Sequence, residues 1–117
     1  MTHILYNERR TMTTVQLPAH RQPTPVDMIV WLEGEANYTR VHYRDGSFTL
    51  VTHPLQWFDQ KLDFIRVHRS AIVNPMYVRE FKQRKSRAGW VQLHNGKILP
   101  VSRSRLTYTD TQLKAVQ

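Results

Sequence analysis

The chain has 117 residues, enough for one small domain and too few for two ordinary globular domains. A hydrophobic share of 40% and a charged share of 22% exclude a disordered or collagen-like chain, and the absence of cysteine excludes disulfides, thiolate zinc sites and cysteine nucleophiles. Seventeen Lys and Arg against nine Asp and Glu give a net charge of +8, which favours polyanionic partners.

The N-terminal part predicts little regular structure. Residues 13–17 alternate weakly between apolar and polar, which indicates an edge strand, and residues 18–25 hold three prolines and form a connector. Residues 28–32 (MIVWL) are a short apolar run of the kind that a buried strand needs. We expect an N-terminal segment at residues 1–26 and a C-terminal tail at residues 106–117 that is weakly helical at best, with the folded domain between them.

Residues 40–52 (RVHYRDGSFTLVT) predict a β-hairpin. Two alternating runs flank Asp45-Gly46, a dipeptide suited to the positive φ angles of a two-residue type I′ turn. Counting outward from such a turn pairs Tyr43 with Phe48 and Val41 with Leu50 on a core face. The opposite face is expected to be wet and to carry the remaining residues: Arg40, His42, Arg44, Ser47, Thr49 and Val51.

Residues 90–102 (WVQLHNGKILPVS) predict a second hairpin, which turns at Asn95-Gly96 and pairs Leu93 with Ile98. The chain has three tryptophans, each with apolar neighbours, and their size and burial tendency favour core packing over stacking on bases. We assign them to the core: Trp31, Trp57 and Trp90.

The stretch between the hairpins predicts one short amphipathic helix and a strand. Pro54 suits a first helical position, and three apolar residues follow at helical spacing: Leu55, Phe58 and Leu62. Residues 64–68 look like a strand, and residues 71–78 look like an apolar turn or short helix whose regularity Pro75 limits. Residues 82–87 (KQRKSR) lack periodicity, so we expect a loop between two strands.

The residues give little support to catalysis. Six histidines are the raw material for a catalytic or metal site, but none lies at metal-ligand spacing, and HExxH, GxSxG and glycine-rich phosphate loops are absent. We therefore expect a protein that is not an enzyme, with no catalytic residue, metal, cofactor or small-molecule substrate. His68 suits a hydrogen-bonded structural role, and Ser70 and Asn74 suit turns or caps.

The chain also lacks signals for a membrane or for export. No apolar run approaches the roughly 18 residues of a membrane span, and residues 1–14 have no continuous apolar region of a secretory signal. We expect a cytoplasmic protein.

The positive charge is concentrated in the second half of the folded part. Residues 1–65 hold six basic and seven acidic residues, whereas residues 66–105 hold ten basic and one acidic residue. Such a surface suits nucleic acid, but it also suits an acidic protein or anionic lipid. The alternative to nucleic-acid binding is therefore a non-enzymatic interaction adaptor that docks on an acidic protein or an anionic membrane surface.

Three phrases carry a resemblance to a known family: LEGEANYTRV (32–41), IRVHRSAIVN (65–74) and LPVSR (99–103). They closely resemble the LytTR family of bacterial DNA-binding domains, and the match runs in family order over about residues 27–105. The resemblance implies a mostly β fold, an elongated stack of small β-sheets with one or two short helices. It also implies a transcriptional regulator that reads double-stranded DNA through loops in successive major grooves and bends the duplex.

The resemblance implies three base-contacting residues: Thr39, Arg69 and Arg103. Asn37, Arg40 and Arg105 flank them and are expected to support them or to contact the DNA backbone. An arginine can donate two hydrogen bonds to guanine, which suits this assignment. Four basic residues in the predicted loop suit phosphates, where they add affinity without reading sequence: Lys82, Arg84, Lys85 and Arg87.

The family commonly follows a phosphorylatable receiver domain, but only residues 1–26 precede the match, too few for an aspartyl-phosphate switch. The chain is therefore expected to act alone, to respond through a separate partner or to be a fragment, and the initial Met favours a complete short protein. We expect double-stranded DNA with repeated sites as the partner, and leave open a homodimer on DNA and a separate regulatory protein. His53-Pro54 stands where the family more often has serine and leucine, which puts the start of the helix in doubt.

Overall fold

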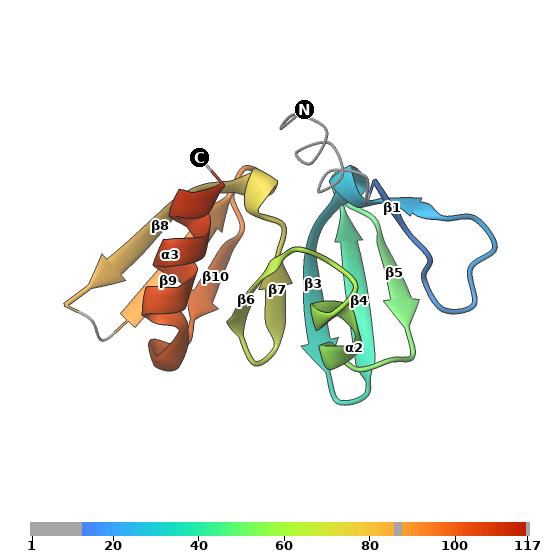
Figure 1. Ribbon diagram of the computed structural model, residues 1–117, viewed down its shortest axis with the longest axis horizontal. Helices are drawn as coiled ribbons and strands as arrows, with labels where there is room; N and C mark the ends of the chain where they lie inside the picture. Colours follow the sequence, from blue (N-terminus) through green and yellow to red (C-terminus); the bar gives the residue numbers. More distant parts are fainter. Residues whose placement is uncertain (1–12, 86–87, 117) are drawn as a thin grey trace, which may run out of the picture.

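The structure is a computed structural model that describes residues 13–85 and 88–116. Within these residues, the strands form three antiparallel sheets. The two larger sheets stand side by side with β6 next to β10, and α3 lies over the three-stranded sheet (Figure 1). The molecule measures 45 × 43 × 24 Å, so this stack of sheets is flat. The expected mostly β architecture of small sheets with short helices is confirmed.

The five-stranded sheet has the order β5-β4-β3-β7-β6, and the three-stranded sheet has the order β10-β9-β8. The first comprises β3 (Ile29–Glu35), β4 (Tyr38–Tyr43), β5 (Phe48–Val51), β6 (Ile65–His68) and β7 (Ala71–Val73). The second comprises β8 (Val78–Arg84), β9 (Ala88–Leu93) and β10 (Ile98–Val101). A two-stranded sheet pairs β1 (Thr14–Val15) with β2 (Thr24–Pro25).

The described residues also form two α-helices and three short 3-10 turns. The helices are α2 (Gln56–Asp59) and α3 (Leu106–Ala115), and the turns are η1 (Val26–Met28), η2 (Pro75–Tyr77) and η3 (Arg103–Arg105). None of the helices in the described part of the chain is long and apolar enough to cross a bilayer.

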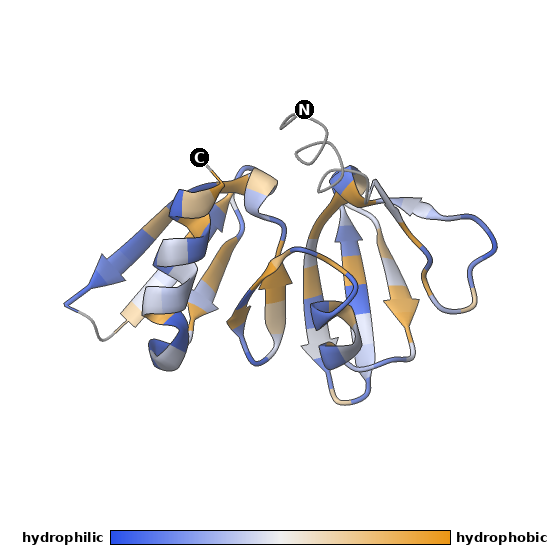
Figure 2. Cartoon of the chain, in the orientation of Figure 1, coloured by the Kyte–Doolittle hydropathy of each residue, from blue (hydrophilic) through white to orange (hydrophobic). Residues whose placement is uncertain are grey.

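Both faces of the five-stranded sheet contribute to a hydrophobic core. On one face, Phe58 of α2 is fully buried in a cluster that it shares with Val15 of β1, Leu32 of β3 and Val41 of β4. On the other face, Val67 and Val73 join a second cluster with the three-stranded sheet and α3. The sheet therefore holds the two halves of the molecule together, and Figure 2 shows its apolar stripes.

The predicted helix begins two residues later than Pro54 and is shorter than the predicted apolar stripe, which extends to Leu62. The nitrogen of Trp57 donates to the carbonyl of Pro54 at 3.0 Å, and the α-helix proper follows at Gln56–Asp59. Leu55, Phe58 and Leu62 are all buried in one cluster, so the predicted apolar stripe is confirmed.

Both hairpins form, but each has a three-residue loop instead of the predicted two-residue turn. The nitrogen of Tyr43 donates to the carbonyl of Ser47, and of the central residues only Gly46 has a positive φ. A type I′ turn needs two such residues, whereas a loop that ends in a glycine bulge needs one. The Asp45 carboxylate also accepts a hydrogen bond from the Ser47 nitrogen, which favours the longer loop. The Ser47 hydroxyl donates to the same carboxylate at 2.6 Å, and this bond, followed by the bond from the Ser47 nitrogen, holds the pKa of Asp45 below its ordinary value.

The longer loop shifts the predicted pairing by one residue. Phe48 pairs with His42, and Thr49 pairs with Val41. As a result Phe48 and Leu50 are exposed and Val51 is buried, the reverse of the predicted faces. The second hairpin behaves in the same way: Leu93 bonds to Lys97, so Ile98 pairs with Gln92 and not with Leu93.

Two further elements differ from the prediction. Residues 71–78 hold a central strand, β7, and then η2; because all three residues of β7 are buried, their sequence shows no alternation to mark a strand. Residues 106–115, predicted as a weakly helical tail, form α3. Leu106, Thr109 and Leu113 are buried on one side of α3, which packs this segment onto the second core cluster.

The assignment of the tryptophans to the core is confirmed for Trp31, whereas Trp57 only packs against a core cluster and Trp90 belongs to neither cluster. Trp31 is buried, whereas Trp57 and Trp90 are half-buried and each has a cation over its ring, Lys61 at 5.2 Å and Arg84 at 5.9 Å. The side chain of Asn74 caps η2 by accepting from the Met76 nitrogen.

Candidate nucleic-acid interface

Three turns lie along one edge of the molecule, the lower edge in Figure 1. They are the β3–β4 turn at residues 36–37, the β6–β7 turn at residues 69–70, and η3. Figure 2 shows that these turns are mostly hydrophilic. We call this feature the turn edge.

Backbone hydrogen bonds connect the three turns. The nitrogen of Gly34, at the end of β3, donates to the carbonyl of Ser70 at 2.9 Å. The nitrogen of Ser102, directly before η3, donates to the carbonyl of Val67 in β6 at 2.8 Å. Because β6 leads directly into residues 69–70, the two bonds fix all three turns relative to one another.

The turn edge is rich in arginine. Arg69 and Arg103 are exposed, and Arg105 is half-buried. Arg66 and Arg69 line a hollow of about 470 Å³ together with Gly34 and Ala36. Arg66 also lines a second hollow of about 310 Å³ with Asp59 and Arg105. Arg69, Arg103 and Arg105 give this edge a positive charge that attracts anions.

Arg66 lies within the family phrase at residues 65–74, but the sequence predicts no role for it. The structure shows one. Its Nε donates to the carbonyl of His68 at 3.0 Å, and its Nη2 donates to the carbonyl of Arg69 at 2.5 Å. Its Nη1 donates to the carboxylate of Asp59 in α2 at 2.7 Å. Arg66 therefore holds the β6–β7 turn and links it to α2.

His68 and Ser70 complete this turn, as their expected structural roles require. The Nδ1 of His68 accepts a hydrogen bond from the Ser70 nitrogen at 3.1 Å and lies 2.9 Å from the Ser70 hydroxyl oxygen.

Thr39 does not reach the surface. Its side chain is fully buried, and its hydroxyl donates to the carbonyl of His53 at 2.8 Å. Glu35 pairs with Tyr38, which points Tyr38 outward and turns Thr39 into the core. A buried hydroxyl cannot touch a base edge, so the expectation of base contact is replaced by a structural role: Thr39 ties β4 to the segment before α2.

Replacing Thr39 with valine is expected to lower the free energy of unfolding by about 1–2 kcal/mol, because the shape is kept but the carbonyl of His53 loses its donor. The affinity for duplex DNA per folded molecule should stay the same. Urea unfolding and duplex titration measure the two effects. A variant of unchanged stability that loses a preferred site would restore the base-contacting role.

The flanking residues occupy different positions. Asn37 is exposed in the β3–β4 turn, next to Ala36, whose φ of 53° is unusual for a residue with a side chain. Arg40 lies on the outer face of β4 and pairs with Glu35 at 2.6 Å. The hydrogen bond to that carboxylate raises the pKa of Arg40. Asn37 is therefore available on the turn edge, whereas Arg40 is engaged by a carboxylate.

The basic segment is mostly strand and lies apart from the three turns. Lys82 and Arg84 belong to β8, so the predicted loop is shorter than expected, and Lys85 is exposed at its start with a φ of 49°. Arg87 lies outside the described residues. Since β8 is the strand of its sheet farthest from β6, these cations extend the basic surface to the side (Figure 1).

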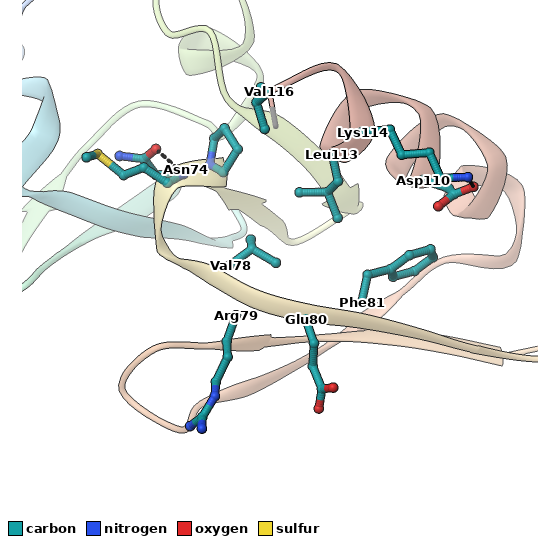
Figure 3. A pocket seen from close by; sticks show the side chains of 11 residues that line it. Asn74, Val78, Arg79, Glu80, Phe81, Asp110, Leu113, Lys114 and Val116 are labelled. Atoms are coloured by element: carbon teal, nitrogen blue, oxygen red, sulfur yellow. Dashed lines mark hydrogen bonds and ion pairs between the residues drawn. The ribbon is translucent and has the colours of Figure 1, made fainter.

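Away from the turn edge, a hollow of about 440 Å³ lies between α3 and β8 (Figure 3). Val78, Phe81 and Leu113 supply apolar surface, and Asp110 pairs with Lys114 at its rim. Among the described residues, no group of His, Asp or Glu could hold a metal ion. The arginine-rich turn edge is thus the candidate site.

Comparisons with known proteins agree with this geometry. The family described as the LytTr DNA-binding domain matches residues 21–114. The chain is 35% identical over 85 residues to the CO-responsive transcriptional regulator RcoM of Rhodospirillum rubrum. This match covers 68% of this chain but only 35% of that protein.

A solved LytTr DNA-binding domain from Bacillus cereus is similar in structure as well. Its TM-score is 0.71 at 27% identity, and the match covers 86% of this chain and 94% of that domain. Since the family match spans most of the sequence and includes all three turns, the chain belongs to the LytTR family of DNA-binding domains and is homologous to transcriptional regulators.

Proposed function

We propose that this domain recognises a specific sequence in double-stranded DNA and thereby regulates transcription. Arg69 and Arg103 contact base edges in the major groove, and Asn37 and Arg105 support them or contact the backbone. Lys82, Arg84, Lys85 and Arg87 bind phosphates beyond the turn edge, and Arg40 has a supporting role through its pair with Glu35. An arginine offers a rigid pair of donors that matches O6 and N7 of guanine.

One observation carries the proposal: two exposed arginines stand at the ends of neighbouring elements that share a hydrogen bond. The bond between Ser102 and Val67 holds the start of η3 beside β6, so Arg103 and Arg69 have a fixed spacing. Groups held by a stiff sheet lose little conformational freedom on binding, which favours recognition of a defined sequence.

Selection of bound sequences from a library of random duplexes tests this function. We expect one enriched sequence that contains guanines, present as repeats if two copies bind side by side. The repeats would also show whether a homodimer forms on DNA. Recovery of random sequences would overturn the proposal of specific recognition, and it would favour the interaction adaptor that docks on an acidic protein or membrane.

Duplex affinity is expected to fall steeply with salt. If about five cations each neutralise one phosphate, log K falls with log salt at a slope of about −4.5, an affinity loss of about 500-fold between 50 and 200 mM salt. Fluorescence anisotropy titrations at several salt concentrations measure this slope. A flat response would contradict phosphate binding by the basic residues.

The input signal of the domain is a separate question. The chain spans about a third of the length of its RcoM relative, so the response of that protein to CO is not carried over to this one. We propose that a separate regulatory protein or segment controls this domain.

A further inference from the structure

The β6–β7 turn does not have the backbone conformation that is usual for a hairpin loop of its length. It is a two-residue hairpin loop, since His68 pairs with Ala71 around Arg69 and Ser70. The favoured loops of this length need a positive φ, yet neither central residue has one. A register shift between Arg66 and His68 bends β6 directly before the turn. Side chains must therefore stabilise it.

Arg66 supplies most of that support. Two of its donors bind the carbonyls on either side of the Arg69 side chain, those of His68 and Arg69 itself. Its third contact, to Asp59 at 2.7 Å, sets the direction of the guanidinium from α2. The Arg66 side chain is only 20% exposed, so most of the group is directed inward toward protein acceptors.

We infer that the Asp59–Arg66 pair positions Arg69 for base recognition. This inference rests on the proposed function, because it assigns Arg66 and Asp59 an effect on DNA through Arg69. A lysine at position 66 would keep the charge but could not span two carbonyls and a carboxylate, since it has a single ammonium group and no planar fork.

Replacing Asp59 with asparagine distinguishes a positioning role from a simple charge effect, because the two roles predict opposite changes in DNA binding. Its carboxylate is a negative charge beside arginines of the turn edge, since it lines a hollow with Arg66 and Arg105. If Asp59 acted only through its charge, Asp59→Asn would tighten binding to every duplex. If Asp59 acts by holding Arg66, Asp59→Asn weakens binding to the preferred sequence relative to random DNA.

The experiment compares affinity for the selected duplex with affinity for a scrambled duplex, using the full chain. We expect Asp59→Asn and Arg66→Lys to lower this ratio about fivefold or more. Asp110→Asn is the matched control: it makes the same change in an ion pair of α3, with Lys114 at 3.1 Å, and should leave the ratio unchanged. An unchanged or higher ratio for Asp59→Asn overturns the inference.

A double-mutant cycle separates positioning from direct contact. In an Arg69→Ala background, Asp59→Asn and Arg66→Lys should have no further effect on the ratio, because the side chain that they position is absent. If both changes still lower it, Arg66 contacts DNA itself and the inference is wrong. If Arg69→Ala alone leaves the ratio unchanged, it is the proposed base contact of Arg69 that fails. Asp59→Asn keeps the test informative if Arg66→Lys does not fold.

Discussion

Replacing Arg103 with alanine is expected to weaken binding to the preferred duplex by about 5- to 150-fold, while binding to a random duplex changes only a few-fold. The reason is that a guanidinium at a base edge contributes to one sequence, whereas a charge near phosphates contributes to all of them. Arg69→Ala should have an effect of the same order. Titration of each variant with both duplexes measures the two losses.

The two arginines should read different base pairs. They stand on separate turns that one backbone hydrogen bond holds at a fixed spacing, so each can reach its own position in the groove. Repeating the selection with each variant should relax the consensus at one position for Arg69→Ala and at another for Arg103→Ala. Relaxation of the same position by both changes would contradict separate contacts.

Lys82→Ala is the control for a phosphate contact. Lys82 is exposed on β8, and its only ion pair among the described residues, with Glu80, has a separation of 3.8 Å at the surface. Loss of this side chain should weaken the selected and random duplexes equally and make the salt slope shallower by about one unit. If Arg103→Ala behaved like Lys82→Ala, Arg103 would be a phosphate contact as well.

The hairpins could be predicted from sequence, but their registers could not. Alternating residues around Asp45-Gly46 mark a hairpin whichever loop closes it. The register depends on the length of the loop, and the bonds from the Ser47 nitrogen and hydroxyl to the Asp45 carboxylate favour three residues. A shift of one residue exchanges the faces of a strand, and this is why Leu50 is exposed and Val51 buried.

The candidate site could be predicted only where short sequence phrases are sufficient to identify a residue. Arg69 and Arg103 were identifiable because they end extended runs inside recognisable phrases, and both are exposed on the turn edge. The burial of Thr39 depends on the register of β4, which short phrases do not specify. The role of Arg66 depends on Asp59, seven residues away on another element, and no local pattern predicts that contact.

Phe58→Ala is expected to have the largest effect on stability, a loss of about 3–5 kcal/mol, because it empties a fully buried site under the five-stranded sheet. In a domain of this size such a loss lowers the Tm by about 15–25 °C.

Leu50→Ala is the informative comparison. A core face containing Leu50, as the two-residue turn would require, makes this change cost about 2–5 kcal/mol.

With the register found here, Leu50 is 50% exposed, and its replacement should cost about 0.5 kcal/mol or less. Urea unfolding of both variants measures the difference. A large loss for Leu50→Ala would contradict the pairing of Thr49 with Val41.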